Sequence, residues 1–315
     1  MKRKIKTAVI GAGSMGKNHV RVYSEISDLV AIADIREDIG KPLAKKYKTK
    51  FYPDYRKMLD REKPDAVSVV VPTQFQKEVA IECLNRKIPT LVEKPIAHTM
   101  EDAEAIIESA SKNKTTLMVG HIERFNPAIL KLKNLINKGT IGRIISILAI
   151  RVGISFPATK NNDVIIDLAV HDIDIFNFLL DSTPISKKTV KHKLFKHNLW
   201  DSASILLEYK NAGCTIVTNW ITPVKMRKLY VTGTDGFVEL DYISQKINLH
   251  GKHMNKKKDG DFYEFLSMYD QPKKEVFISH KEPLKEELQF FLNSAAYNVK
   301  VDTSFALDAL KIVLT

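Results

Sequence analysis

The feature that most constrains the fold is a glycine-rich turn between a short apolar run and a helical pattern. The stretch Thr7 to His19 reads as a strand, the turn and the first turns of a helix. Gly11 permits a tight turn, Gly13 lets the backbone approach a pyrophosphate, and Gly16 lets the helix pack on the strand. The helix N-terminus directs N–H groups at the phosphates. The pattern therefore predicts a dinucleotide site with contacts from Gly11, Gly13, Ser14, Met15 and Gly16.

A carboxylate follows the next strand pattern, Leu29 to Ala33, about 20 residues beyond the first glycine. At this place a carboxylate binds the adenine ribose hydroxyls and repels a 2′-phosphate. The carboxylate is Asp34, and Arg36 two residues on would offset part of the repulsion. The sequence therefore predicts NAD as cofactor, with NADP less favoured, and Asp34 and Arg36 among its contacts.

Strand patterns and helix patterns continue to alternate up to about residue 120, which indicates a parallel, doubly wound sheet. Ala66 to Val71 is an apolar, β-branched run typical of a strand buried on both faces. In such sheets the ligand lies at the carboxyl ends of the strands. Pro72 and Thr73 follow one strand pattern, and Glu93 and Lys94 close another, so we expect all four to contact the cofactor.

The pattern changes near residue 121. An unusually apolar helical stretch, Val164 to Leu180, is followed from Ile185 onward by strand patterns joined by turns, which indicate an antiparallel sheet. The sequence therefore predicts an α/β fold in two domains. Residues 1–121 form a NAD-binding Rossmann domain, and residues 122–315 form an α+β domain for substrate binding and oligomerisation, with a large, mostly antiparallel sheet. The C-terminal helix 303–315 is expected to pack back near the first domain.

Composition excludes several classes of protein. The chain has 315 residues, of which 44% are hydrophobic and 27% charged, as in soluble globular proteins. No apolar run reaches the roughly 20 residues that span a bilayer, and no signal-peptide pattern follows the basic start, so we expect a cytoplasmic protein that binds no membrane. Cys83 and Cys214 have no partner spacing. They therefore predict neither a disulfide framework nor a zinc site.

The net charge of +12 raises the question of nucleic acid. The densest basic run, Lys256 to Lys258, lies in a polar stretch without interleaved aromatic residues, and no helix-turn-helix pattern is present. We therefore interpret that run as a solvated loop and expect no nucleic-acid partner. A positive field also attracts anionic small molecules such as dinucleotides and nucleotide sugars.

The apolar helix carries a polar stripe. Asp167 and His171 are four residues apart and Asp174 follows three further on, so all three fall on one face of an α-helix. Buried carboxylates and imidazoles need partners, so the stripe is either an internal polar network or the lining of a site. A carboxylate one turn away can orient a histidine that acts as a general base. No third or fourth ligand at a known spacing accompanies the stripe, so no metal is expected.

These motifs together resemble the glucose-fructose oxidoreductase, inositol dehydrogenase and MocA (Gfo/Idh/MocA) family over essentially the whole chain. The resemblance rests on the glycine turn, Asp34, Glu93-Lys94-Pro95, and Asp167 with His171 ahead of an antiparallel sheet. It implies that Lys94, Asp167 and His171 face the nicotinamide and a sugar, and that the bond before Pro95 is often cis. The runs 120–127, 151–153 and 165–174 resemble the UDP-N-acetylglucosamine 3-dehydrogenase branch of that family.

The sequence also departs from the family pattern. Many members have glycines where this chain has Asn161-Asn162-Asp163 and Ala169, and many have histidine where this chain has Gln76. The first two changes, at 161–163 and Ala169, affect the expected entry to the substrate pocket more than the chemistry.

The expected reaction is hydride transfer from a secondary alcohol of a sugar ring to NAD. His171, oriented by Asp167, would accept the proton while Lys94 holds the oxygen, and Lys94 itself is the alternative base. Arg124, Asn126 and Arg151 are candidates for substrate contact, with surface ion pairs as the other reading of the arginines. Rival functions are an inositol or simple-hexose dehydrogenase and a non-catalytic NAD-dependent sensor. A homodimer or homotetramer formed through the C-terminal sheet is expected.

Overall fold

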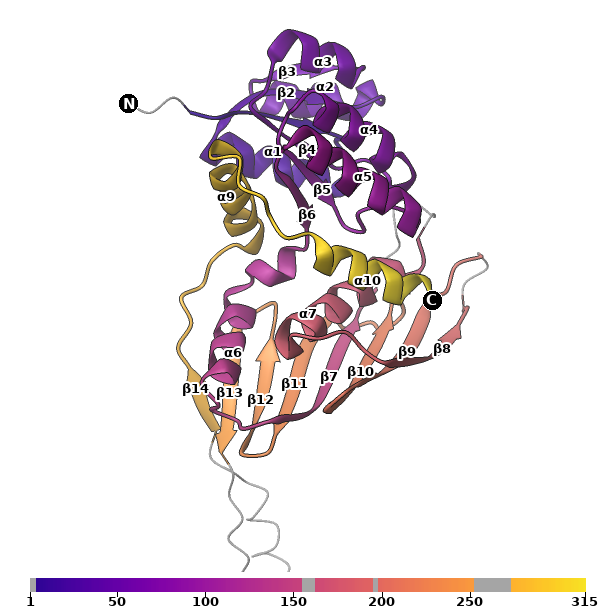
Figure 1. Cartoon of the computed structure of the whole chain (residues 1–315), viewed down its shortest axis with the longest axis vertical. Coiled ribbons are helices and arrows are strands. Elements are labelled where there is room, and N and C mark those ends of the chain that lie inside the picture. Colours follow the sequence, from indigo (N-terminus) through magenta and orange to yellow (C-terminus); the bar gives the residue numbers. More distant parts are fainter. Residues whose placement is uncertain (1–3, 155–161, 195–197, 252–272) are drawn as a thin grey trace, which may run out of the picture. The chain divides into compact units, whose positions relative to one another are not determined.

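The computed structural model describes residues 4–154, 162–194, 198–251 and 273–315. The chain divides into two compact units. Met1–Phe125 with Glu282–Thr315 is called here the nucleotide-binding unit, and Asn126–Lys281 is called the sheet unit. Figure 1 shows the elements of both. The first boundary lies within a few residues of the predicted one, whereas residues 282–315 group with the first unit rather than with the predicted second domain.

Among the described residues, the nucleotide-binding unit contains a six-stranded parallel sheet in the order β3-β2-β1-β4-β5-β6. This order confirms the predicted doubly wound fold, because strand order reverses beside β1 and a dinucleotide binds at such a reversal. The strands are β1 Lys6–Ile10, β2 Asp28–Ala33, β3 Lys50–Tyr52, β4 Ala66–Val69, β5 Thr90–Glu93 and β6 Leu117–Gly120.

Helices cover both faces of this sheet, with α1 on one side and α4 and α5 on the other (Figure 1). The strands β4, β5 and β6 are buried along their whole length, as continuous apolar runs predict. The helices of the parallel-sheet region are α1 Ser14–Ile26, α2 Glu37–Lys46, α3 Tyr55–Glu62, α4 Thr73–Asn85 and α5 Met100–Asn113, followed by the 3₁₀ turn η1 Ile122–Phe125.

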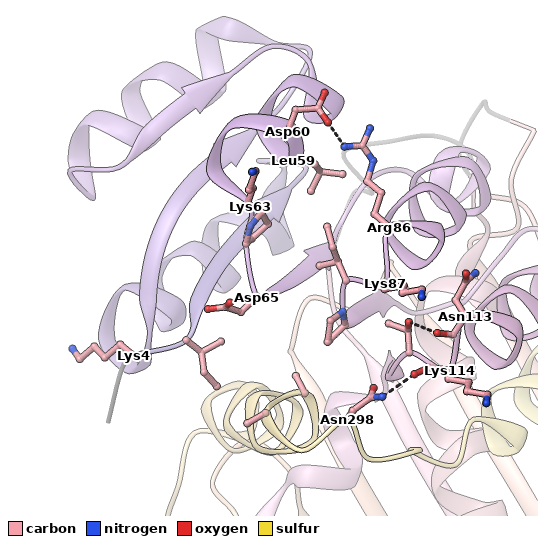
Figure 2. Close-up of a pocket in the computed structure, with 17 residues that line it drawn as sticks. Lys4, Leu59, Asp60, Lys63, Asp65, Arg86, Lys87, Asn113, Lys114 and Asn298 are labelled. Atoms are coloured by element: carbon pink, nitrogen blue, oxygen red, sulfur yellow. Dashed lines mark hydrogen bonds and ion pairs between the residues drawn. The ribbon is translucent and has the colours of Figure 1, made fainter. Parts of the chain in front are cut away.

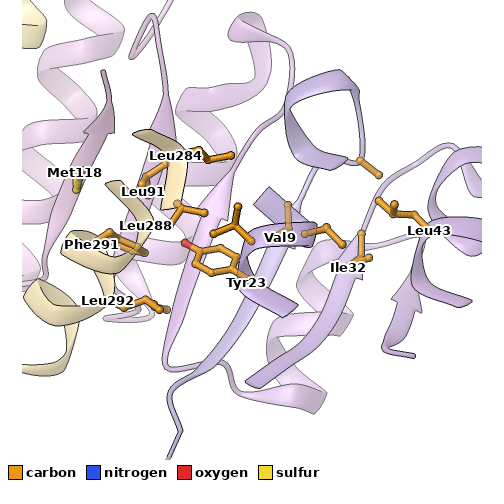
Figure 3. Close-up of a cluster of buried hydrophobic side chains, with 14 of the residues drawn as sticks. Val9, Tyr23, Ile32, Leu43, Leu91, Met118, Leu284, Leu288, Phe291 and Leu292 are labelled. Carbon is orange, nitrogen blue, oxygen red and sulfur yellow. The ribbon is translucent and has the colours of Figure 1, made fainter. Parts of the chain in front are cut away.

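The two C-terminal helices join the nucleotide-binding unit, as expected for the helix at 303–315 but not for the helix before it. Helix α9, Pro283–Ala296, contacts α1, and helix α10, Ser304–Leu314, contacts α5. Figure 3 shows Tyr23 of α1 facing Leu288 and Phe291 of α9 in the apolar core, where all three side chains are fully buried. Burial of such side chains is worth roughly 1.5–3 kcal/mol each, so α9 stabilises this unit.

In the described part of the sheet unit, eight strands form one sheet in the order β14-β13-β12-β11-β7-β10-β9-β8. The pair β7 and β10 is parallel and the other neighbours are antiparallel, which confirms the predicted mostly antiparallel sheet. The strands are β7 Ile144–Val152, β8 Ser186–His192, β9 Ser202–Tyr209, β10 Ala212–Asn219, β11 Met226–Gly233, β12 Gly236–Asp241, β13 Lys246–Gly251 and β14 Lys273–Val276.

Helices cover one face of this second sheet, since α6, Pro127–Asn137, contacts β13 and α7, Val170–Leu180, contacts β7 (Figure 1). Burial alternates along β9, so one face of that strand is buried and the other is open. The basic run Lys256 to Lys258, predicted to be a solvated loop, lies outside the described residues. None of the helices in the described ranges is long and apolar enough to cross a membrane.

Candidate active site

The glycine turn lies at the carboxyl end of β1, as predicted. Gly11 has a φ of +101°, and its N–H donates to the carbonyl oxygen of Ala33 at 2.8 Å. A Cβ at Gly11 would overlap the Val70 carbonyl, and a Cβ at Gly16 would overlap the carbonyl of Gly11. A Cβ at Gly13 would meet only the Arg36 guanidinium, at 3.9 Å. The fold therefore requires two of the glycines, whereas the third leaves open space beside the N-terminus of α1.

Asp34 turns its carboxylate toward the glycine turn. Its Oδ2 accepts the N–H of Ala12 at 2.6 Å and its Oδ1 accepts the N–H of Arg36 at 2.8 Å. The half-exposed Arg36 side chain also places its Nε 3.6 Å from Oδ1. The open cradle at Gly13, the helix N-terminus and this carboxylate are the groups that a dinucleotide needs, so the residues present fit NAD.

The open space at Gly13 gives a test of the cofactor site that does not depend on folding. In Gly13→Val the added methyl groups fill the open space in which we expect a phosphate of the cofactor to bind. We expect the Kd for NADH to rise at least about tenfold, or 1.4 kcal/mol, with little change in Tm. Gly16→Ala should instead lower the Tm, and Gly213→Val, where nothing lies within 4 Å, is the matched control. Fluorescence titration with NADH and thermal melts measure both effects; unaltered NADH binding in Gly13→Val would contradict the assignment.

Lys94 follows β5 directly, at the same edge of the sheet as the glycine turn. The Lys94–Pro95 bond is cis, as the resemblance implies, and the lysine side chain is half-buried. Pro72 and Thr73 lie at the start of α4, after β4. The structure thus brings the predicted cofactor residues of this unit to the carboxyl edge of one sheet.

Glu93, predicted to contact the cofactor, is buried and bonded to other protein groups. Its Oε1 lies 2.9 Å from Nε2 of His19, and its Oε2 accepts the backbone N–H of Lys94 at 3.1 Å. The buried Gln76 donates from Nε2 to the Glu93 carbonyl at 2.9 Å. Sequence reasoning missed His19, although its position three residues after Gly16 places it on the inner side of α1.

A second carboxyl group, on α9, belongs to the same buried region. Glu287 is fully buried, and neither of its oxygens has a hydrogen-bond partner among the described residues. Burial raises the pKa of Glu287 well above its usual value, and the nearby Glu93 carboxylate raises that pKa further. Glu287 therefore favours its neutral, protonated form.

The raised pKa of Glu287 makes stability depend on pH in a defined direction. Below the pKa of the unfolded chain both states hold the proton, and as pH rises the unfolded chain loses it first, which destabilises the folded state. Glu287→Gln removes this proton while keeping the shape. We expect its Tm advantage over the parent to grow from pH 4.5 to pH 8, whereas the exposed control Glu104→Gln shows none. Thermal melts across this range test it; an advantage that shrinks with rising pH would show the reverse linkage.

The predicted continuous helix from Val164 to Leu180 begins differently in the structure. Ile165–Ala169 is a π-helical turn that leads into α7, and the Asp163 side chain accepts the N–H groups of Ile165 and Ile166. Asn161, noted as a departure from the family, lies outside the described residues. Because a π turn has more residues per turn than an α-helix, the predicted regular stripe does not hold at its start. Such turns are frequent at functional sites.

Asp167 lies in this π turn and His171 lies in the first turn of α7. Both side chains are half-buried, whereas Asp174 is buried. The indole N–H of the buried Trp220 donates to Oδ2 of Asp167 at 3.2 Å. The side chains of Asp167 and His171 are thus partly exposed, whereas Asp174, the third residue of the predicted stripe, lies in the interior.

Two of the three residues predicted to contact substrate, Arg151 and Asn126, bind other protein groups within the sheet unit. Nε and Nη2 of Arg151 bond to the two oxygens of Asp172 at 2.7 and 2.9 Å, and both side chains are buried. Asn126 is buried as well, where its Oδ1 accepts the Ala128 N–H and its Nδ2 donates to the Tyr242 carbonyl. These contacts favour structural roles over substrate contact.

The third candidate, Arg124, lies over the ring of Phe305 on α10, with its guanidinium carbon 3.8 Å from the ring centroid. Hydrogen bonds from Ser304 lower the pKa of Asp302, and the positive charge of Arg124 lowers that pKa further. This cation–π contact fixes the C-terminal helix within the nucleotide-binding unit. The sequence predicted that Arg124 contacts substrate or forms a surface ion pair, and neither prediction includes its contact with the Phe305 ring.

Neither cysteine belongs to the predicted site. Cys83 and Cys214 are buried and form no disulfide. Burial raises the pKa of each thiol to about 12, so neither is a thiolate at neutral pH. Within the described ranges, no three His, Cys, Asp or Glu side chains are grouped to hold a metal ion.

A hollow of about 900 Å³ lies at the opposite, amino edge of the parallel sheet (Figure 2). Its lining includes residues just before β1, β4, β5 and β6 and none of the predicted site residues. Three lysines with left-handed backbone line it: Lys63 and Lys114 directly follow α3 and α5, and Lys87 lies two residues after the end of α4. Cations at helix C-termini offset the negative end of the helix dipole, which explains the basic lining.

Comparison with known proteins matches both units to one family. Residues 5–121 match the oxidoreductase family with an NAD-binding Rossmann fold, and residues 129–239 match the GFO/IDH/MocA C-terminal domain. A UDP-N-acetylglucosamine 3-dehydrogenase of Acidithiobacillus ferrooxidans is 25% identical over 93% of this chain and 89% of its own. The solved structure of the enzyme of that name from the same organism has a TM-score of 0.85 at 23% identity, over 100% of this chain and 96% of that one.

An inositol 2-dehydrogenase of Salmonella typhimurium is 28% identical over 59% of this chain and 57% of its own length. The Rossmann match agrees with the glycine turn and Asp34, and confirms NAD as the cofactor class. The chain therefore belongs to the Gfo/Idh/MocA family of oxidoreductases, as an NAD-dependent dehydrogenase of the sugar and polyol class.

Proposed function

We propose that this enzyme oxidises the 3-hydroxyl of UDP-N-acetylglucosamine, or of a related UDP-aminosugar, with NAD. The observation that carries the proposal is similarity along 93% of the chain to a UDP-N-acetylglucosamine 3-dehydrogenase, where the inositol 2-dehydrogenase match spans 59%. Lys94, at the same sheet edge as the glycine turn, together with Asp167 and His171 supports a dehydrogenase rather than a sensor, since binding alone would not need them. The net charge of +12 favours an anionic substrate.

In the proposed mechanism, His171, Asp167 and Lys94 act on one substrate alcohol. Bound NAD supplies the acceptor for the hydride that leaves the alcohol carbon. His171 accepts the hydroxyl proton, and Asp167, fixed by Trp220, stabilises the imidazolium that forms. Lys94 donates a hydrogen bond to the same oxygen and stabilises the charge that develops on it as the carbonyl forms. Lys94 as the base, with His171 as the donor, is the alternative arrangement.

A thermal-shift panel tests the substrate class. With NAD present, the true class of sugar should raise the Tm further than NAD alone, because a ligand that binds only the folded state stabilises it. We expect UDP-N-acetylglucosamine to do so, and myo-inositol and free hexoses not to. NADH formation with the same panel separates an enzyme from a sensor. Stabilisation by inositol alone would replace the proposed substrate with that of the rival class.

We also propose that the enzyme is a cytoplasmic homodimer or homotetramer that associates through its second sheet. The open face carries exposed Val190 and Leu206 and the stacked rings of Tyr230 and Phe237, whose centroids are 6.2 Å apart. Apolar side chains on an open sheet face are typical of a self-associating surface. Light scattering on the purified protein gives the number of copies; a monomer at all concentrations would contradict the proposal.

A further inference from the structure

His19 links the cofactor-binding helix to the loop that carries the lysine. It lies in α1, on the turn after Gly16, and its side chain is fully buried. Its Nε2 lies 2.9 Å from Oε1 of Glu93, at the end of β5. A buried hydrogen bond to a carboxylate is stronger than the same bond in water, so it ties the two elements together.

The other carboxylate oxygen of Glu93 binds the backbone of the next residue, Lys94. Oε2 accepts the N–H of Lys94 at 3.1 Å, and the Glu93 carbonyl accepts from Gln76 at 2.9 Å. A Cβ at Gly120 would lie 3.1 Å from Oε1, so the carboxylate also packs closely against Gly120. Glu93 is therefore fixed from several sides, and the backbone direction of Lys94 is fixed with it.

Two other buried polar groups of this unit, Glu287 and the Tyr23 hydroxyl, do not replace His19. Glu287 of α9 is fully buried, and its oxygens make no hydrogen bond among the described residues. The Tyr23 hydroxyl bonds to Ser68 instead, at 2.7 Å. Burial raises the pKa of Glu287, so its carboxyl group favours the neutral form, and in neither form does it carry a positive charge. Loss of the imidazole would leave Oε1 without its buried partner.

We propose that His19 is a positioning residue for Lys94: it acts through the Glu93 carboxylate and couples the direction of the lysine to the helix that binds the dinucleotide phosphates. The contact of Lys94 with substrate rests on the proposed function. The chain from His19 through Glu93 to the Lys94 amide is a property of the nucleotide-binding unit alone.

Two substitutions separate positioning from simple packing. His19→Gln keeps an N–H donor near the place of Nε2, whereas His19→Leu fills similar space without a donor. We expect His19→Leu to lower kcat by about 10²-fold, because small displacements of a catalytic group have effects of this size, while the Kd for NADH changes little. His19→Gln should restore most of kcat. The exposed His98→Leu is the matched control.

A second readout does not depend on turnover. Brief acetylation with acetic anhydride, followed by peptide mass spectrometry, gives the labelling rate of Lys94 relative to the exposed Lys87 in the same molecule. This ratio should change in His19→Leu and return toward the parent value in His19→Gln. Equal ratios in all three proteins, or equal kcat in the two variants, would overturn the proposal. A parent protein that oxidises no sugar but shows the labelling change would overturn only the proposed function.

Discussion

Replacement of His171 by alanine is expected to lower kcat by about 10²–10⁴-fold while the Kd for NADH stays nearly unchanged. The imidazole lies in the first turn of α7, in the sheet unit, so its removal leaves the glycine turn and Asp34 intact. Lys94→Ala should give a loss of similar size, because the oxygen of the substrate then loses its charged donor. Initial rates of NADH formation and fluorescence titration with NADH measure the two quantities separately.

Matched controls make this result specific. His280→Ala removes an exposed histidine of the same unit, and Lys87→Ala removes an exposed lysine of the other unit, so both should keep the parent kcat. If His171→Ala and Lys94→Ala both retain turnover, the assignment of the reaction centre is wrong. If only one of them does, the proton acceptor is the residue whose loss abolishes turnover.

Breaking the buried pair between Arg151 and Asp172 is expected to have the largest effect on stability. Both side chains are almost completely buried, and two hydrogen bonds of 2.7 and 2.9 Å join them. In Asp172→Leu the guanidinium stays buried without its counter-ion, and removal of one partner of such a pair costs about 3–5 kcal/mol. With roughly 2–4 °C per kcal/mol for a domain of this size, the Tm should fall by about 6–20 °C.

The double variant Arg151→Met with Asp172→Leu tests the physical reason. Replacing both charges by apolar side chains removes the uncompensated charge, so much of the lost stability should return. The exposed pair of Arg56 and Glu78 is the control, because surface ion pairs contribute about 0–1 kcal/mol. Calorimetry of the single and double variants checks this. A double variant as unstable as Asp172→Leu would show that Arg151 stabilises the sheet unit by some other contact.

The predictions from sequence were most accurate for features that depend on residues close together in the chain. Gly11, Gly13 and Gly16 specify a turn geometry through adjacent residues alone, and the alternation of apolar runs and helices specifies a parallel sheet. The edge of the sheet at which Lys94 lies followed from the same rule. Each inference needs only the spacing of residues within one strand, turn and helix.

Inferences about side-chain partners were weaker, because partners come from distant segments. Arg151 was a candidate for substrate contact, yet its guanidinium is paired with Asp172 from another element. The π turn at Asp167 was not foreseen, since apolar periodicity does not distinguish a π turn from a regular helix. Glu93 was expected to contact the cofactor, whereas the structure shows it bonded to His19.

The sequence by itself determined the family, the cofactor class and the edge of the sheet where the chemistry is expected. Glycine spacing and the alternation of strand and helix patterns can be recognised from residues that are close together in the chain. Only the tertiary structure decided that α9 belongs to the nucleotide-binding unit together with α10, and that Glu287 of α9 lies near enough to Glu93 to feel its charge. The reason is physical. Burial and pairing depend on which surfaces meet after the chain has folded, and a carboxyl group that ends without a partner in an apolar core looks, in sequence, like any exposed glutamate.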